Sequence, residues 1–166
     1  ILLNVRFEVK HDKFFIEKYM CRKENCCKSD LKECLAMKEV FYEEEDCIVY
    51  WDSSNNWIYT DWRNIPKVET VKKGCAEILT LLQQKSCSKI LNDNQNVTGA
   101  WSGAAKWVAE EWFPLAIQSG LQKFAWIQSP HSALSQMNAS HSEREDENDV
   151  IKLFLDAKEA ENWLKS

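Results

Sequence analysis

Residues 89–128 read KILNDNQNVTGAWSGAAKWVAEEWFPLAIQSGLQKFAWIQ and contain three segments of different periodicity. A short apolar run at 90–91 is followed by a polar turn, then by apolar residues at helical spacing from 102 onward, and then by a second apolar run at 123–128. This succession predicts a strand–helix–strand unit. Such units lie in the middle of α/β sheets, so the stretch indicates an α/β fold.

The residues before this unit predict an antiparallel meander and a helix. Short strands are expected at 40–42, 47–51 and 57–62, because the segments between them are acidic or rich in turn formers. A helix that begins after Pro66 is expected to pack on the sheet. Its apolar stripe recurs at steps of three and four residues, and consists of Val68, Val71, Cys75, Ile78 and Leu82.

The later part of the chain predicts an interrupted helix and one more strand–helix pair. Ser102 is expected to cap the central helix, Pro114 to kink it, and Gly120 to end it in the left-handed conformation. One helical turn is expected within 133–137, and a last strand at 150–155. Asp156 is then expected to cap the final helix.

Composition limits the class of protein. The 166 residues fit one domain, and the formal charge of −5 argues against a nucleic-acid-binding protein. No apolar run is long enough to cross a bilayer, and the first residues do not read as a signal peptide, so a cytoplasmic location is expected. We expect a domain at 37–166 preceded by an N-terminal extension at 1–36. The alternative is that 1–36 form the first strand and helix of one domain.

The seven cysteines are interpreted mainly as reduced thiols. A zinc site in the first part of the chain is the alternative, although an adjacent pair lacks the usual two-residue gap. The four cysteines concerned are Cys21, Cys26, Cys27 and Cys34.

No set of residues predicts catalysis. Ser102 lies in the sequence Gly-Ala-Trp-Ser-Gly at 99–103, which is one position out of register with a nucleophile elbow and does not directly follow a strand. Ser102 is interpreted as a helix cap or as a phosphoacceptor at a helix N-terminus. Asp93 ends a strand, where α/β proteins place functional residues, and is otherwise a loop-capping carboxylate. We therefore expect no enzyme activity, no cofactor and no metal.

Eight tryptophans indicate heavy aromatic packing or an aromatic-lined cavity between helices and sheet. The candidates for a ligand pocket are the tryptophans near the turn and the central helix, namely Trp62, Trp101, Trp107 and Trp112.

Four runs of the sequence bear on its family: Ile-Leu-Asn-Asp-Asn at 90–94, Trp-Phe-Pro at 112–114, Gly-Leu-Gln-Lys-Phe-Ala at 120–125, and the ending at 154–164. Together with the order of elements, they resemble the STAS/SpoIIAA-like superfamily. More narrowly, they resemble uncharacterised STAS/SEC14-like proteins of Bacteroidetes. The resemblance covers the chain from Met37 to its last residue. It implies a mixed sheet of about five to six strands, with an antiparallel meander and then strand–helix–strand units, covered by three to four helices.

The resemblance also implies a binding function. In the anti-sigma-factor antagonists of this superfamily, a strand-end Asp and a phosphorylated Ser at a helix start form a partner surface. The matching residues here are Asp93 and Ser102, with Trp101 in place of an acidic residue. We expect a non-enzymatic protein that binds a protein partner through Asp93, Asn94, Trp101 and Ser102. The alternative, from similarity to SEC14 domains, is a carrier or sensor of a small apolar ligand. A homodimer is left open.

Overall fold

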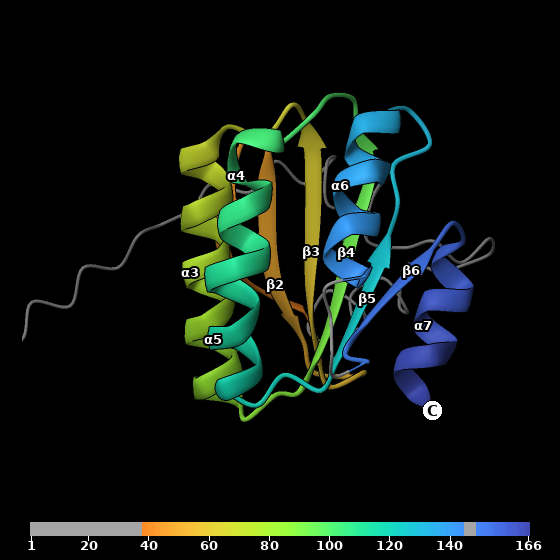
Figure 1. Cartoon of the computed structure of the whole chain (residues 1–166). Coiled ribbons are helices and arrows are strands. Elements are labelled where there is room, and N and C mark those ends of the chain that lie inside the picture. Colours follow the sequence, from red (N-terminus) through yellow and green to blue (C-terminus); the bar gives the residue numbers. More distant parts are fainter. Residues whose placement is uncertain (1–37, 145–148) are drawn as a thin grey trace, which may run out of the picture. The chain divides into compact units, whose positions relative to one another are not determined.

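Six strands form one mixed sheet in the part of the chain that the structure, a computed structural model, describes: residues 38–144 and 149–166 (Figure 1). Their order in the sheet is their order in the chain. The first three pair antiparallel and the last three add in parallel. The α/β class and the mixed sheet are as expected. The strands are β1 (Lys38–Glu44), β2 (Cys47–Asp52), β3 (Trp57–Asn64), β4 (Lys89–Val97), β5 (Lys123–Ile127) and β6 (Ile151–Phe154).

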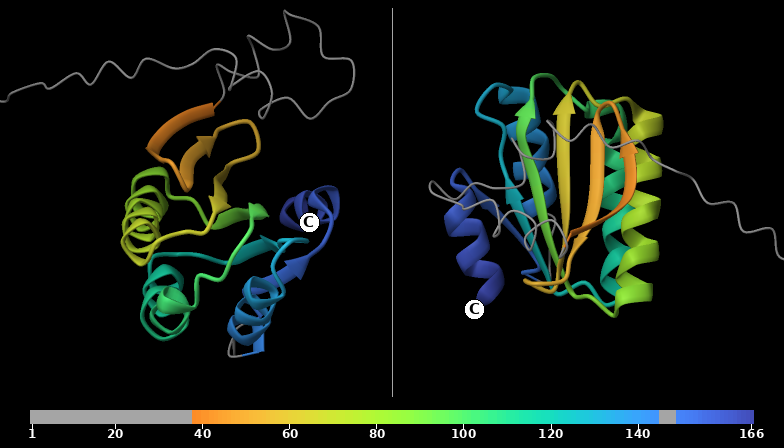
Figure 2. Two further views of the ribbon diagram at one scale, coloured as in Figure 1. Left: turned by 90° about the horizontal axis from the view of Figure 1, so that it is seen from above. Right: turned by 180° about the vertical axis from the view of Figure 1, so that it is seen from behind.

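The helices cover both faces of this sheet. Figures 1 and 2 show α3, the α4–η1–α5 segment and α6 on one face, here called the helical face, and α7 on the other. Each helix follows a parallel strand, so β3 to β6 alternate with helices along the chain. The bounds are α3 (Val68–Lys85), α4 (Ser102–Trp107), η1 (Val108–Trp112, a π-helix), α5 (Phe113–Gln118), α6 (Ala133–Arg144) and α7 (Ala157–Lys165).

Alternation along the strands creates two cores. In β3, Ile58 and Trp62 belong to the core under the helical face, whereas Trp57 and Tyr59 belong to the core under α7. This is the period of two that a strand between two covered faces requires. The same alternation continues in β4 and β5, and it decides which side chains meet in the cavity described below.

Strand β4 is longer than the sequence predicts. A polar turn was expected after Asp93, but β4 continues to Val97, and Asn96 pairs with Arg63 of β3. The prediction was wrong because strand pairing uses main-chain groups, which polar side chains do not prevent. The buried carboxamide of Asn94 also has a side-chain partner within the strand.

The central helix is distorted where a kink was expected, although the distortion begins before the proline. Residues 108–112 form a π-helix, and Pro114 lies at the start of α5. Proline has no N–H, and its ring crowds the carbonyl four residues earlier, which lies inside the π-helical turn. Gly120 has φ 103°, the left-handed conformation predicted for the helix end.

Two other local predictions need correction. The N-cap of α4 is Trp101, and Ser102 is its first helical residue, so Ser102 does not occupy the expected capping position. Residues 133–144 form a helix of 12 residues rather than one turn. The predicted extension at 1–36, with its four cysteines, lies outside the described residues.

Polar contacts hold α7 at both ends. As predicted, Asp156 caps the helix: its Oδ1 accepts the backbone N–H of the third helical residue at 3.0 Å. At the other end, Lys89 Nζ donates to the Leu164 carbonyl at 2.5 Å and Lys123 Nζ donates to the Trp163 carbonyl at 3.0 Å. Cations are favourable at helix C-termini. Because these lysines begin β4 and β5, they anchor α7 to the middle of the sheet.

Candidate functional site

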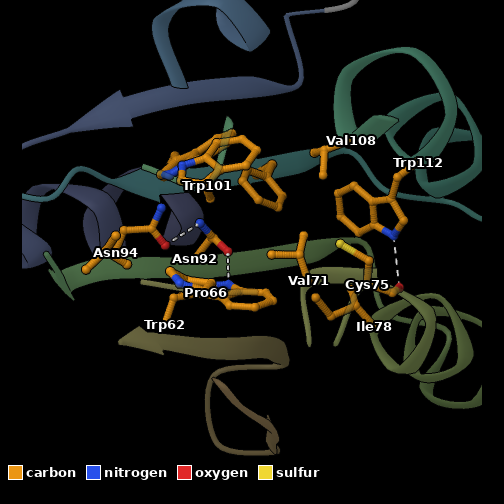
Figure 3. A pocket seen from close by; sticks show the side chains of 13 residues that line it. Trp62, Pro66, Val71, Cys75, Ile78, Asn92, Asn94, Trp101, Val108 and Trp112 are labelled. Atoms are coloured by element: carbon orange, nitrogen blue, oxygen red, sulfur yellow. Dashed lines mark hydrogen bonds between the residues drawn. The ribbon is translucent and has the colours of Figure 1, made fainter. Parts of the chain in front are cut away.

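A cavity lies under the helical face, where β3, β4 and β5 meet α3, η1 and the turn before α4 (Figure 3). Its volume is about 40 Å³, room for about three water molecules. With the open space at its mouth, the empty volume is about 460 Å³. The wall is mostly apolar and includes four tryptophans and two asparagines, which are Trp62, Trp101, Trp112, Trp126, Asn92 and Asn94.

Strand register brings the polar part of this wall together. In the parallel pairing, Asn92 of β4 lies beside Trp126 of β5 on one side and Thr60 of β3 on the other. All three are on the helical face, since side chains at equivalent register positions point the same way. Asn94, two residues along β4, is on the same face, and Figure 3 shows it farther from Trp112 than Asn92 is.

A hydrogen-bond network fixes the two carboxamides. Asn92 Oδ1 accepts from Thr60 Oγ1 and from Trp62 Nε1, both at 2.8 Å. Asn92 Nδ2 donates to Asn94 Oδ1 at 3.2 Å. Both asparagines are at most 5 % exposed, and buried amides are stable only when their polar atoms have partners. The network therefore holds Trp62 and both carboxamides in one arrangement.

The other indole groups differ in whether they have partners. Trp112 Nε1 donates to the Cys75 carbonyl at 2.9 Å, and Trp101 Nε1 donates to Ser135 Oγ at 3.2 Å. Trp126 Nε1 is buried and has no hydrogen-bond partner in the part of the chain that the structure describes. Leaving a buried donor unsatisfied costs about 1–3 kcal/mol, and Trp126, a residue of the cavity wall, carries such a donor.

The cavity carries no charged side chain among the lining residues that the structure describes. The ionisable group among the described lining residues is the Cys75 thiol, and burial raises the pKa of that thiol. The thiol is therefore protonated at neutral pH. A site of this kind offers apolar contact and hydrogen bonds but no charge.

Three of the four predicted pocket tryptophans line the cavity: Trp62, Trp101 and Trp112. Trp107 does not, and the Lys72 ammonium lies 5.1 Å from the centre of its ring. The prediction missed Trp126. The signal was present in the alternation of β5, which places Trp126 on the same face as Phe124.

The residues expected to form a partner surface do not share one exposed patch. Asp93 is 1 % exposed and is on the opposite face, where it accepts from Tyr59 Oη at 2.5 Å and from the Gln95 backbone N–H at 3.0 Å. Asn94 and Trp101 are buried in the cavity wall. Of Ser102 the structure describes the backbone alone. Binding of a protein partner at these residues stays a prediction.

Neither a metal nor a membrane site emerges from the described ranges 38–144 and 149–166. No group of His, Cys, Asp and Glu there could hold a metal ion, and no helix there is long and apolar enough to cross a membrane. Cys47, Cys75 and Cys87 are buried free thiols.

Comparison of the chain with protein-family models, with curated protein sequences and with solved structures finds no match.

Proposed function

We propose that the protein binds a small, largely apolar ligand in the tryptophan-lined cavity. The observation that carries this proposal is the cavity itself: it has aromatic walls, is partly open to solvent, and holds two carboxamides in fixed positions. Ligand sites in proteins combine apolar walls with a few oriented polar groups in this way. Figure 3 shows Asn92 and Asn94 toward one end and Trp112 toward the other.

The size of the cavity limits the ligand. A volume of about 40 Å³ is too small for a lipid chain unless the walls move. Two wall residues, Val108 and Trp112, lie in the π-helical turn η1. Single π-helical turns are less regular than α-helix and occur frequently at functional sites. We therefore expect η1 to be the part of the wall that moves when a larger ligand binds.

The proposed role is binding rather than catalysis. Proton transfer and nucleophilic chemistry need titratable side chains that converge on one point, and the wall offers the protonated Cys75 thiol alone among its described residues. We further propose that residues 37–166 form a STAS/SpoIIAA-like domain. The support for this is the antiparallel meander followed by strands that alternate with helices in consecutive order.

Native mass spectrometry of the protein purified from its own host tests the binding function. We expect an added mass that is lost on denaturation. Val108→Phe fills the cavity and should remove the added mass, because Val108 is 5 % exposed in the wall. Leu115→Phe is the matched control, since Leu115 lies in α5 with 48 % of its surface exposed.

The added mass should persist in the Leu115→Phe variant. Circular dichroism would establish that both variants are folded. An added mass retained by Val108→Phe would place the ligand outside this cavity, and wild-type protein without any added mass would count against the proposal.

A further inference from the structure

The cavity has a polar end and an apolar end. Figure 3 shows Asn92 and Asn94 toward one end and Trp112 toward the other. At the Trp112 end, Val108 lies four residues earlier in η1, and the Cys75 carbonyl accepts the indole N–H. No described lining residue carries a charge, and a buried charge is stable only beside an opposite charge or a full set of hydrogen bonds. A bound molecule is therefore uncharged and has its apolar part toward Trp112.

Trp112 closes the apolar end as a fixed wall. The residue is 2 % exposed, and its Nε1 donates to the Cys75 carbonyl at 2.9 Å. Its ring also packs edge-to-face on Phe113 and Phe124, with ring centres 4.9 and 6.0 Å away. Aromatic pairs favour this geometry. The indole is therefore held by α3 through the hydrogen bond and by β5 through the Phe124 ring.

A ligand that is too long must displace this indole. Trp112 lies in η1, so a movement of that turn which lengthens the cavity at this end breaks the hydrogen bond to Cys75. The N–H is then left buried without its partner, which is unfavourable. Affinity should thus rise with ligand length while the apolar part fills existing space, and should fall once the chain reaches Trp112.

We infer that Trp112 sets the longest ligand that the cavity accepts, and that this ligand is an uncharged molecule with one polar group and a short apolar chain. The polar group lies toward Asn94, and the chain ends against the Trp112 indole. This assignment rests on the proposed binding function and adds the orientation and the upper length of the ligand.

The straight-chain primary alcohols from propanol to octanol test this assignment. A hydroxyl both donates and accepts hydrogen bonds, as a carboxamide does, and each added methylene lengthens the apolar part by the same amount. Calorimetric titration measures the affinity of each alcohol. We expect the affinity to rise roughly fourfold per methylene, the value for burial of one such group, up to an optimum within the series, and then to fall.

Replacing the indole with a smaller ring should move this optimum. Trp112→Phe keeps an aromatic ring beside Phe113 and Phe124 but removes the larger indole and its N–H. The optimum should move to an alcohol longer by one or two methylenes. The affinity of that alcohol should rise roughly four- to sixteenfold over its value in the wild type. Trp107→Phe is the matched control, since Trp107 lies in α4 and does not line the cavity, and it should leave the optimum unchanged.

A milder variant covers the case in which Trp112→Phe does not fold. Ile78 lines the cavity and is 1 % exposed. Ile78→Val removes one carbon from the side chain, a change that folded cores usually accept. It should raise the affinity of the alcohol next beyond the wild-type optimum, by up to roughly fourfold. Circular dichroism establishes whether each variant is folded.

Indole N–H resonances in ¹H–¹⁵N spectra locate the bound alcohols. Binding in the cavity should move resonances of the tryptophans in its wall and leave that of Trp163 in place, because Trp163 lies in α7 on the other face of the sheet.

The outcomes separate this assignment from the proposed function. If the alcohols bind in the cavity but the optimum is the same in folded Trp112→Phe, or moves equally in Trp107→Phe, the role of Trp112 is overturned and the binding function stands. An affinity that rises through octanol in the wild type also overturns it, because the chain then meets no end wall. If Trp112→Phe is unfolded, an unchanged series in Ile78→Val overturns it. If no alcohol moves any cavity indole, the proposed function itself is overturned.

Discussion

Replacing Asn92 with Leu should destabilise the protein by about 2–4 kcal/mol, because three buried groups lose their partner at once. These groups are the Thr60 hydroxyl, the Trp62 indole N–H and the Asn94 side-chain oxygen. Leucine has a branching pattern similar to that of asparagine and provides no polar atom. The change therefore removes hydrogen bonds while it keeps most of the packing.

The magnitude follows from the burial of the three groups. Thr60 is 0 %, Asn94 4 % and Trp62 6 % exposed, so water does not replace the lost partner at any of them. An unsatisfied buried group costs about 1–3 kcal/mol. Three such groups at the lower part of that range reduce the free energy of unfolding by about 3–5 kcal/mol. The larger apolar surface of Leu stabilises the folded protein by about 1 kcal/mol, which offsets part of this loss.

Urea denaturation followed by circular dichroism measures the loss without relying on tryptophan emission. Thr60→Val in the Asn92→Leu background removes the Thr60 hydroxyl, one of the two donors that lose their acceptor in Asn92→Leu. The double variant should therefore be about 1 kcal/mol more stable than the two separate losses predict. The Trp62 N–H resonance should also move upfield in the Asn92→Leu variant, as expected for a lost hydrogen bond.

A loss below about 1 kcal/mol in Asn92→Leu would refute the reasoning, because it would mean that the three groups find other partners. Strict additivity of the stability losses caused by Asn92→Leu and Thr60→Val would also refute it, because it would show that Thr60 and Asn92 are not energetically coupled.

Three further predictions concern the rest of the fold. Gly74→Ala should destabilise the protein by about 1 kcal/mol in urea, because the added Cβ would lie 2.9 Å from Trp62 Cη2 and overpacking outweighs the gain in helix propensity; a more stable variant would contradict this. Lys123→Met should cost about 1–2 kcal/mol by loss of the contacts at the C-terminus of α7, whereas Lys158→Met, an exposed change of the same charge, should cost little. Burial raises the pKa of the Cys75 thiol, so above about pH 8.5 the unfolded chain loses this proton while the folded chain keeps it. Stability should then fall by about 1.4 kcal/mol per pH unit for this thiol, and Cys75→Ala should show a shallower fall between pH 8.5 and 10 in thermal denaturation.

Periodicity predicted most elements of the fold because it reflects which face of each element is buried. The stripe of α3 from Val71 to Leu82, the left-handed Gly120 and the Asp156 cap are local features, and local chemistry determines them. The end of β4 is not local. Residues 94–97 are strand because β3 lies beside them, and no pattern within the segment itself reports that neighbour.

The cavity could be predicted in part. The aromatic content indicated a tryptophan-lined site, and Trp62, Trp101 and Trp112 are in it. Asn94 reads as a turn residue, and Asn92 reads as part of the polar end of a strand, because asparagine in sequence is far more often exposed than buried. The role of Asn92 depends on Thr60 and Trp62, which lie 32 and 30 residues away in the chain. The N–H of Trp126 lacks a partner among the described residues because of how the interior packs, and no sequence pattern predicts this.

Because strand order equals chain order, β1 and β6 are the two edges of the sheet. A force applied between residues 38 and 166 would therefore pull across the strands rather than along them. Within the described sheet, each strand pairs only with its neighbours in the chain, so strands should detach one after another from the outside, as repeats do in a solenoid. The strands that carry the cavity, β3 to β5, are interior strands of this order. In a single-molecule pulling experiment, a ligand in the cavity should raise the force of the late steps and leave the first ones unchanged.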